Sequence, residues 1–593
     1  MTTQTNYPII RPTLELDFAN SKQLDPRITF TRSSPAVYYD GKTSALAEQN
    51  LFVRSQTFSD GTWVKGGTVT ATDNATTAPD GTTTASSIIP STSTGQHYLY
   101  QGATISGAIG TISVYAKANG YTKVFISDIG AATLSATYDL TAVTATVGIG
   151  CTTTITSVGN GWYRLTATST ASFGTKAVNI VPYPTGATID NFAPQFTGDG
   201  TSGAFLWGAQ VEQRSSATAY NTTTTTAITN YIPVLLSAVN NVPRFDCNPV
   251  TGQSLGLLVE QQSTNLLTYS GNLANSIWTS SECTIISNSA IAPDGSSNTI
   301  LFIPSANSAA HWTQQIFTSS GPTVNGTVYV KKNSSIDKVS LWGGTNSTMA
   351  HFNLTALTTS YEANVSSTII TSVGNGWYRL SATFTGSLTV GFRIYASNGT
   401  LGASATAGDG FSGIYIWGAQ LEALAFPTSY IPTVATTMTR SAEISAMTGT
   451  NFSSWFNLGQ GTIYTHTSIP VINSSTNNLF YRIGPAHSMG TAVVGNGTIV
   501  FDKSGIGTQF YYNGTATSGS NIKTAFTYNT TGFTGSLNGG AIATSTNTID
   551  TGSYQLSFGS EFGGGNYLNG YIRKLSYYPY ALSNAQLQAL TSS

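Results

Sequence analysis

The sequence Asn160-Gly161-Trp162-Tyr163-Arg164-Leu165 occurs a second time as Asn375-Gly376-Trp377-Tyr378-Arg379-Leu380. Thr-Ser-Val-Gly precedes both copies, and in the second an alternating stretch continues from Trp377 to Phe384. The residues after each Asn-Gly pair alternate between the two faces of an extended chain, which is typical of a β-strand. An Asn-Gly pair itself favours the tight turn of a β-hairpin. The repeat therefore predicts two copies of one β-rich domain.

Further matches follow in the same order along the chain. They pair Asn50-Leu51 with Asn265-Leu266, Ala78-Pro79-Asp80-Gly81 with Ala292-Pro293-Asp294-Gly295, Val114-Tyr115-Ala116-Lys117 with Val328-Tyr329-Val330-Lys331, and Trp207-Gly208-Ala209-Gln210-Val211-Glu212 with Trp417-Gly418-Ala419-Gln420-Leu421-Glu422. These matches predict one repeat over residues 46–225 and another over residues 263–440, each of ordinary domain size.

Composition indicates sheets throughout the chain. Charged residues are 8% and aromatic residues 11% of the 593 residues, whereas about 25% charged residues is usual. Many aromatic and β-branched residues between short turns favour β-sandwiches or jelly rolls. We predict an all-β protein with tandem sandwich domains and a further strand-rich region over residues 441–593. One helix is predicted near Leu587 and Leu590, with Ser583 as its N-cap.

Charge, cysteine content and hydropathy disfavour several classes of function and several structural features. The formal net charge is −1, so long-range attraction of a nucleic acid is not expected. Three widely spaced cysteines indicate neither a disulfide framework nor a zinc site. The residues that follow Met1 lack the basic and apolar regions of a secretory signal, and no long apolar run predicts insertion into a membrane.

Five segments outside the two repeats share a further pattern. They are Leu14-Glu15-Leu16-Asp17-Phe18, Asp25-Pro26-Arg27-Ile28-Thr29-Phe30-Thr31-Arg32, Val242-Pro243-Arg244-Phe245-Asp246, Gly256-Leu257-Leu258-Val259-Glu260 and Leu568-Asn569-Gly570-Tyr571-Ile572-Arg573-Lys574-Leu575. These segments resemble structural proteins of tailed bacteriophages. In that family the first segments lead into one jelly roll similar to a carbohydrate-binding module. The last segment is similar to the closing strand of concanavalin A-like (laminin-G-like) domains. Here the first repeat lies between the two leading segments, which departs from the family's pattern.

The resemblance implies a virion fibre that attaches to host-surface glycan without catalysis, made in the host cytoplasm. It implies a virion-attachment segment at 1–45, jelly-roll repeats at 46–225 and 263–440, a linker at 226–262 and a concanavalin A-like lectin domain at 441–593. It also implies a homotrimer that contacts other virion proteins. A purely structural virion protein, in the tail or the head, and a glycan-degrading tailspike are the alternatives.

Aromatic and histidine residues are the candidates for glycan contact. His97-Tyr98 and His311-Trp312 occupy matching positions, while Trp342 and Tyr395 have no same-type counterpart in the first repeat. A hydrogen-bonded structural histidine is the competing interpretation. For the repeated Trp162, Trp207, Trp377 and Trp417, we expect core packing, because large aromatic side chains stabilise a sandwich by burial.

Acidic residues offer little for a metal or for catalysis. Asp80 and Asp294 follow a proline in matching turns and are the candidate ligands for a structural calcium ion, although a turn alone explains an Asp-Gly pair. Glu212 and Glu422 recur at one repeat position, which favours a structural role over a single pair of glycosidase carboxylates. No nucleophile elbow, metalloprotease motif or P-loop is found, and no cofactor other than calcium is expected.

Overall fold

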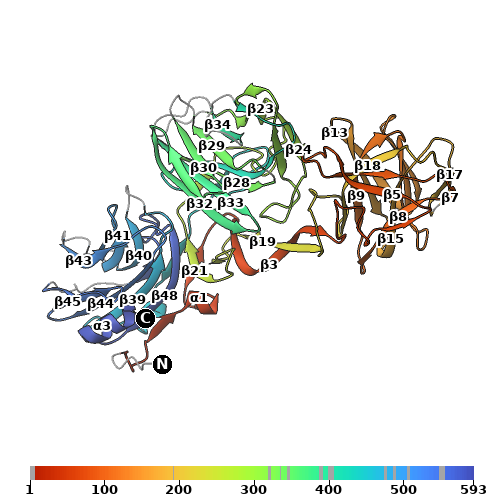
Figure 1. The fold of residues 1–593 in the computed structure, drawn as a ribbon. Helices are drawn as coiled ribbons and strands as arrows, with labels where there is room; N and C mark the ends of the chain where they lie inside the picture. The colour runs from red at the N-terminus through yellow and green to blue at the C-terminus, as the bar shows by residue number, and fades with distance from the viewer. Residues whose placement is uncertain are drawn as a thin grey trace.

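The computed structural model describes residues 7–592 except residues 191, 318–321, 334, 344–347, 386–390, 398–405, 473–476, 485–488, 504–507 and 547–554. The described chain is almost entirely β, and it forms three separate sandwiches (Figure 1). Two are jelly rolls and the third is a sandwich of two antiparallel sheets, so the predicted all-β sandwich and jelly-roll fold class is confirmed.

The first jelly roll packs two six-stranded antiparallel sheets around one core. One sheet has the order β12 (Thr144–Ile149), β11 (Ser135–Asp139), β10 (Lys123–Asp128), β15 (Gly174–Tyr183), β8 (Tyr98–Ile105) and β4 (Val64–Gly66). The other has the order β13 (Cys151–Gly159), β14 (Trp162–Ser169), β9 (Thr111–Asn119), β18 (Gly203–Glu212), β6 (Ala85–Ile89) and β5 (Thr70–Thr76). A small sheet of β16 (Thr188–Ile189), β17 (Pro194–Thr197) and β7 (Thr94–Gln96) closes one end.

The second jelly roll repeats this arrangement strand by strand. One sheet has the order β23 (Thr279–Ser281), β27 (Trp312–Gln315), β34 (Phe392–Ser397), β29 (Lys338–Gly343), β30 (Met349–Asn353) and β31 (Thr358–Tyr361). The other has the order β24 (Cys283–Ser287), β25 (Ile300–Pro304), β36 (Ile414–Glu422), β28 (Thr323–Lys332), β33 (Trp377–Thr385) and β32 (Val365–Gly374). A short pair joins β26 (Ser308–Ala309) to β35 (Thr406–Ala407).

The repeated turn and the repeated tryptophans behave as the sequence predicts. Asn160 and Gly161 have φ of 51° and 77°, and Asn375 and Gly376 have φ of 48° and 74°, which a type I′ hairpin turn requires at both central positions. All four repeated tryptophans are buried: Trp162, Trp207, Trp377 and Trp417 are at most 4% exposed. The expectation of core packing is therefore confirmed.

Three distant segments of the chain build the third sandwich, which we call the composite sandwich. Its larger sheet has the order β20 (Arg244–Cys247), β21 (Ser254–Val259), β48 (Gly570–Tyr578), β39 (Gly461–Ser468), β44 (Asn521–Asn529), β45 (Gly532–Leu537) and β46 (Ala543–Ser545), and β1 (Leu14–Leu16) also pairs with β48. Its second sheet has the order β2 (Thr29–Thr31), β38 (Ile444–Met447), β47 (Leu556–Phe558), β40 (Asn478–Ile483), β41 (Met489–Val493), β42 (Thr498–Lys503) and β43 (Thr508–Thr515).

The composite sandwich changes the domain boundaries in two places. Residues 226–262 are not a linker, because they supply β20, β21 and a further strand, β19 (Ile228–Ala238). Within residues 1–45, Leu14, Leu16 and Phe18 are at most 2% exposed and belong to the core of the composite sandwich. Hydrophobic burial joins these short strands to residues far away in sequence, which no local pattern reveals.

Two antiparallel pairs mark where the jelly rolls leave and rejoin the composite sandwich. The long strand β3 (Ala36–Asn50) pairs with β19, and its last residue Asn50 lies opposite Ile228. The short strand β22 (Ser263–Asn265) pairs with β37 (Met438–Arg440), so that Asn265 lies opposite Met438. Each jelly roll is thus an insertion that begins and ends at one place. In Figure 1 the β3–β19 pair leads from the composite sandwich past the second jelly roll to the first.

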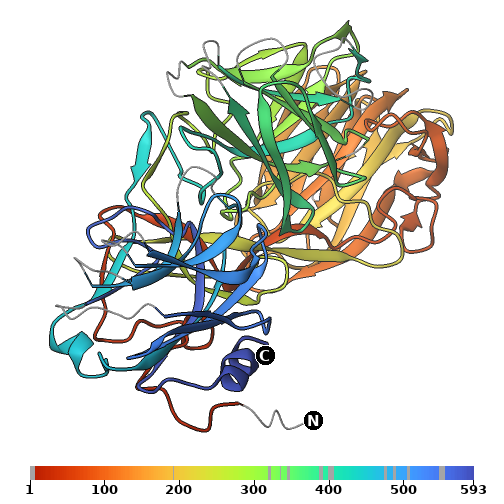
Figure 2. The same ribbon diagram turned by 90° about the vertical axis from the view of Figure 1, so that its left-hand side faces the viewer.

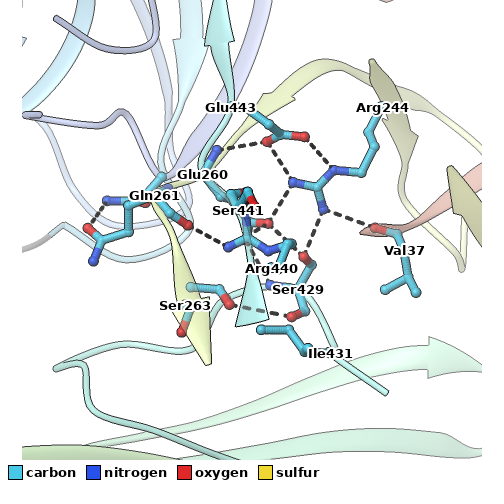
Figure 3. A network of polar contacts seen from close by, with 12 residues as sticks. Val37, Arg244, Glu260, Gln261, Ser263, Ser429, Ile431, Arg440, Ser441 and Glu443 are labelled. Atoms are coloured by element: carbon cyan, nitrogen blue, oxygen red, sulfur yellow. Dashed lines mark hydrogen bonds and ion pairs between the residues drawn. The ribbon is translucent and has the colours of Figure 1, made fainter. Parts of the chain in front are cut away.

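A buried network of charges lies where the inserted segments meet (Figure 3). Arg244 donates to Glu260 at 2.8 Å and to Glu443 at 2.7 Å. Arg32 donates to the other oxygen of Glu443 at 2.8 Å, and Nη2 of Arg440 lies 3.5 Å from Glu260. The network joins residues that lie more than 400 positions apart in sequence, and it fixes the junction by paired, hydrogen-bonded charges.

The part of the chain that the structure describes has three short helices: α1 (Phe18–Ser21), α2 (Thr450–Ser453) and α3 (Asn584–Ser592). The predicted C-terminal helix is confirmed as α3, in which Leu587 and Leu590 are buried. Ser583 and Gln586 cap it reciprocally, because the Gln586 N–H donates to Ser583 Oγ and the Ser583 N–H donates to Gln586 Oε1. Among the described residues, no helix combines the length and apolar character needed to cross a bilayer.

Candidate functional site

The outer face of one sheet of the second jelly roll gathers aromatic and polar side chains. The strand register places Gln314 on β27 and Trp342 on β29 on either side of Arg393 on β34. Trp312 lies opposite Tyr395 in the same register. Side chains at alternate positions share one face of a strand, so these five lie together on the face away from the core. We call them the Arg393 cluster.

The guanidinium of Arg393 is at the centre of the Arg393 cluster. It lies 4.3 Å from the ring centroid of Trp312, 4.5 Å from that of Trp342 and 5.7 Å from that of Tyr395. Its Nε donates to Oε1 of Gln314 at 2.7 Å, and Nη1 donates to the Tyr395 hydroxyl at 2.8 Å. Cation–π attraction and two hydrogen bonds therefore hold the side chain in one orientation.

The Arg393 cluster is partly exposed at its two tryptophans and its arginine. Tyr395 is 5% and Gln314 8% exposed, whereas both tryptophans and Arg393 are half-buried. A half-exposed indole offers a flat apolar surface, and the fixed guanidinium and amide offer directional hydrogen bonds. This combination suits a sugar ring, which has an apolar C–H face and hydroxyl groups around its edge.

A polar group from the neighbouring strands continues this face. Ser340 lies opposite Tyr395 on one side and opposite His351 on the other. The Nδ1 atom of His351 is 2.9 Å from Ser340 Oγ, and its Nε2 atom is 3.7 Å from Oε1 of Glu362. Burial lowers the pKa of His351 below its ordinary value, although Glu362 partly offsets the effect. The neutral imidazole therefore offers hydrogen bonds and no charge at neutral pH.

The first jelly roll has a different surface at the matching place. Its register aligns Tyr100, Asn179 and Ser127 where the second has Gln314, Arg393 and Trp342. Asn179 is fully buried and its Oδ1 accepts from the Leu99 N–H at 2.9 Å. Ser127 donates to the carbonyl of Phe192 at 2.5 Å, so the chain covers the position that Trp342 occupies in the second repeat.

The predicted site residues separate into two groups. The structure brings Trp312, Trp342 and Tyr395 together around one arginine. It places His97 and His311 in the interior, 0% and 3% exposed. Nδ1 of His97 is 2.8 Å from the Gly67 carbonyl, and Nδ1 of His311 is 2.5 Å from the Glu282 carbonyl. Both histidines match the structural interpretation, and neither reaches the face on which its neighbour lies.

Tyr98 lies apart from the Arg393 cluster, and Arg393 itself was not a predicted site residue. Tyr98 is half-buried on the outer face of the first jelly roll, 5.9 Å from the ring of Tyr100. Arg393, the central residue of the cluster, was not among the candidates. Its signal in the sequence is the alternation of Arg393 with Tyr395 within one strand, which places a cation beside a candidate aromatic residue.

The aspartates proposed for calcium cap their own turns. Oδ1 of Asp80 accepts from the Thr82 N–H at 3.0 Å, and Oδ1 of Asp294 accepts from the Ser296 N–H at 2.9 Å. Among the residues that the structure describes, no group of three metal-ligating side chains is present. A single turn-capping carboxylate supplies too few ligands for the six to eight oxygens that calcium prefers.

The repeated glutamates are structural in both jelly rolls. Glu212 and Glu422 are fully buried, and each accepts hydrogen bonds from the N–H and hydroxyl of a threonine six residues later, Thr218 and Thr428. Burial raises the pKa of Glu212 above its ordinary value. The same arrangement in both repeats stabilises the loop that follows the closing strand.

Comparison with known proteins gives distant structural likenesses only. No protein-family model and no curated protein matches the chain. A tandem CBM22 domain of Paenibacillus barcinonensis Xyn10C is 12% identical, with 64% of this chain and 98% of that chain covered and a TM-score of 0.18. Domains LG4-5 of the mouse laminin α1 chain are 14% identical, covering 46% and 85%, with a TM-score of 0.16. A heptameric pentraxin of Limulus polyphemus is 14% identical, covering 23% and 70%, with a TM-score of 0.19. Likenesses with TM-scores this low carry no information about function.

Proposed function

We propose that the chain is a non-catalytic glycan-binding protein and that the Arg393 cluster is its binding surface. The observation that supports this most is the pair of half-exposed indoles, Trp312 and Trp342, held on either side of a hydrogen-bonded guanidinium. The aromatic rings stack on the sugar and the polar atoms orient it. A flat site of this size binds one sugar unit weakly.

We further propose that the protein is a fibre of a bacteriophage virion that attaches to the host surface. Weak single sites suit this role, because several copies on one particle, such as a homotrimer, bind with high avidity. Both termini lie at the composite sandwich, and the first jelly roll lies farthest from it (Figures 1 and 2). The composite sandwich, which contains the N-terminal strands, would then contact other virion proteins, and the jelly rolls would project.

The test is binding of the full chain to a glycan array and to whole host cells, followed by calorimetry with the strongest ligand. We expect Trp312→Ala to weaken binding at least about tenfold, which corresponds to a loss of ~1.4 kcal/mol. Tyr98→Ala, at the matching position of the first jelly roll, is the control and should bind as the unsubstituted protein does.

Three results would count against the proposal. If both Trp312→Ala and Trp342→Ala keep the affinity of the unsubstituted protein, the Arg393 cluster is not the binding surface. Loss of binding in the Tyr98→Ala control would place it on the first jelly roll. Absence of any glycan or cell binding at concentrations that allow avidity would favour the purely structural virion protein. Thermal unfolding of each variant separates loss of binding from loss of fold.

A further inference from the structure

Arg393 has no carboxylate partner among the residues that the structure describes. Six acidic residues occur between residues 263 and 440: Glu282, Asp294, Asp337, Glu362, Asp409 and Glu422. Each of the six contacts other groups, and no ion pair joins Arg393 to any described carboxylate. The stretches of this repeat that the structure does not describe contain no Asp or Glu. The positive charge of Arg393 is therefore not neutralised within its own domain.

The guanidinium also keeps hydrogen-bond donors for a ligand. Nε and Nη1 are engaged by Gln314 and Tyr395. Nη2 donates to none of the described residues, and it is not among the buried polar atoms that lack a partner. Arg393 as a whole is only half-buried. A guanidinium presents its N–H groups in a planar fork that matches the two oxygens of a carboxylate.

The charges around the cluster favour an anion there. Two described carboxylates lie near this sheet: Glu362 is on the far side of His351, and Asp337 is paired with Lys338 of β29 at 2.6 Å. An arginine between two aromatic rings is partly shielded from water, so its attraction for an opposite charge is stronger than at a fully exposed site. The site therefore has one uncompensated cation beside two sugar-stacking surfaces.

We propose that the ligand of the Arg393 cluster is an acidic glycan, in which the carboxylate of a uronic or sialic acid binds Arg393 while the sugar ring stacks on Trp312 or Trp342. This inference rests on the proposed glycan binding and adds the chemical class of the sugar. The first jelly roll has buried Asn179 at the position of Arg393, so it does not share this preference.

The experiment measures the affinity of the full chain for paired glycans that differ only in charge. The probes are oligogalacturonate, hyaluronan oligosaccharides and α2,8-linked polysialic acid, each beside its methyl-esterified or carboxyl-reduced counterpart, with dextran sulfate as a sulfated polyanion. We expect at least one acidic glycan to bind about tenfold or more tightly than its neutral counterpart, with the difference decreasing as salt increases.

Variants of Arg393 separate charge recognition from stacking. Arg393→Gln should weaken binding of the acidic member of the pair more than binding of the neutral one, and so remove the preference between them. Arg393→Lys should retain part of the preference, because it keeps the charge and loses the planar fork. Trp312→Ala should weaken both members alike. Tryptophan fluorescence and thermal unfolding identify any variant in which the rings have lost their arrangement. If Arg393→Gln is such a variant, Arg393→Lys still tests the effect of the charge.

The outcomes distinguish this inference from the proposed function. Binding of neutral glycans through Trp312 with no gain from the carboxylate would overturn the acidic-ligand inference and leave glycan binding in place. Equal loss for both members in Arg393→Gln and Arg393→Lys would also overturn it. Preference for dextran sulfate over every carboxylated glycan would overturn the carboxylate assignment and indicate that Arg393 binds a sulfate ester. No binding of any probe would reject both proposals.

Discussion

At the scale of single residues, Arg244 links the inserted domains to the composite sandwich. It is fully buried, and besides Glu260 and Glu443 it donates to the Val37 carbonyl at 3.0 Å and to Ser429 Oγ at 2.7 Å. One side chain thus contacts the ribbon that leads to the first jelly roll, a loop of the second, and the composite sandwich. Removing it leaves two buried carboxylates short of their partner.

We expect Arg244→Ala to lower the free energy of unfolding by about 3–5 kcal/mol, the cost of breaking a buried ion pair by deleting one partner. Chemical denaturation monitored by circular dichroism measures it. Arg27→Ala is the control, because the ion pair of Arg27 with Asp25 is partly exposed and such pairs contribute at most about 1 kcal/mol. Equal effects of the two substitutions would contradict the assigned role of the network.

Asp246 gives the junction a dependence on pH. Burial raises its pKa to about 6, although hydrogen bonds from the Tyr39 N–H and the Tyr571 hydroxyl and the charge of Arg244 oppose the effect. The folded state therefore binds a proton between the ordinary value of 3.8 and about 6 that the unfolded chain does not bind. The stability that Asp246 contributes is complete below about pH 4 and is lost as the pH rises through about 6.

Comparison with Asp246→Asn isolates this contribution. The difference in unfolding free energy between the unsubstituted protein and the variant should fall by roughly 2–3 kcal/mol between pH 4 and pH 7. Asp25→Asn is the control. The hydrogen bond from Arg27 lowers the pKa of Asp25. The difference in unfolding free energy between the unsubstituted protein and Asp25→Asn should therefore stay nearly constant above pH 5. A flat profile for Asp246→Asn would mean that Asp246 titrates near its ordinary value.

At the scale of elements, the repeated Trp-Gly-Ala-Gln sequence forms a bulge in the closing strand of each jelly roll. Gly208 and Gly418 have φ of 62° and 64°, and the pairing of β18 with β9 and of β36 with β28 shifts at this point. The bulge sits beside buried aromatic side chains, because a Cβ atom on Gly418 would lie 2.8 Å from Cδ2 of Tyr329. Glycine is required here by both the backbone and the packing.

Gly418→Ala should therefore destabilise the second jelly roll by about 1–3 kcal/mol. Thermal unfolding resolved by tryptophan fluorescence measures the effect. Gly61→Ala is the matched control, since a Cβ atom there has no neighbour within 4 Å and its φ is not in the left-handed region. An unchanged unfolding temperature for Gly418→Ala would show that the strand tolerates a regular pairing at this position.

At the scale of the whole molecule, the jelly rolls are insertions into the composite sandwich. Asn50 and Ile228 face each other at the end of the β3–β19 pair, so the whole first jelly roll leaves and returns across one pair of residues. Its hydrophobic core is separate from those of the other sandwiches. A domain with its own core and adjacent ends is expected to fold on its own and to be removable.

Deletion of residues 51–227, with Asn50 joined to Ile228 through an Asn-Gly turn, should give a folded monodisperse protein that retains binding at the Arg393 cluster. Size-exclusion chromatography and circular dichroism test the fold. Deletion of residues 441–593 is the contrasting change. It removes β48, the partner of β1 and β21, so the apolar side chains of these two strands should become exposed and cause aggregation. Aggregation of the first variant together with solubility of the second would reject the insertion scheme.

The all-β class, the two repeats, the buried tryptophans and the C-terminal helix follow from the sequence, since alternation, turn chemistry and repetition are local properties. Trp342 and Tyr395 were identifiable as aromatic residues without a same-type counterpart in the first repeat, and Trp312 was identifiable as part of a repeated His-aromatic pair. The tertiary structure alone decided that residues 14–31 and 244–259 complete a sandwich with residues 444–578, because strand pairing and hydrophobic burial act between segments at any separation in sequence. It also decided that Arg393 lies between the two indoles without a carboxylate partner, because the register of three neighbouring strands, and not the spacing of residues along the chain, places them side by side.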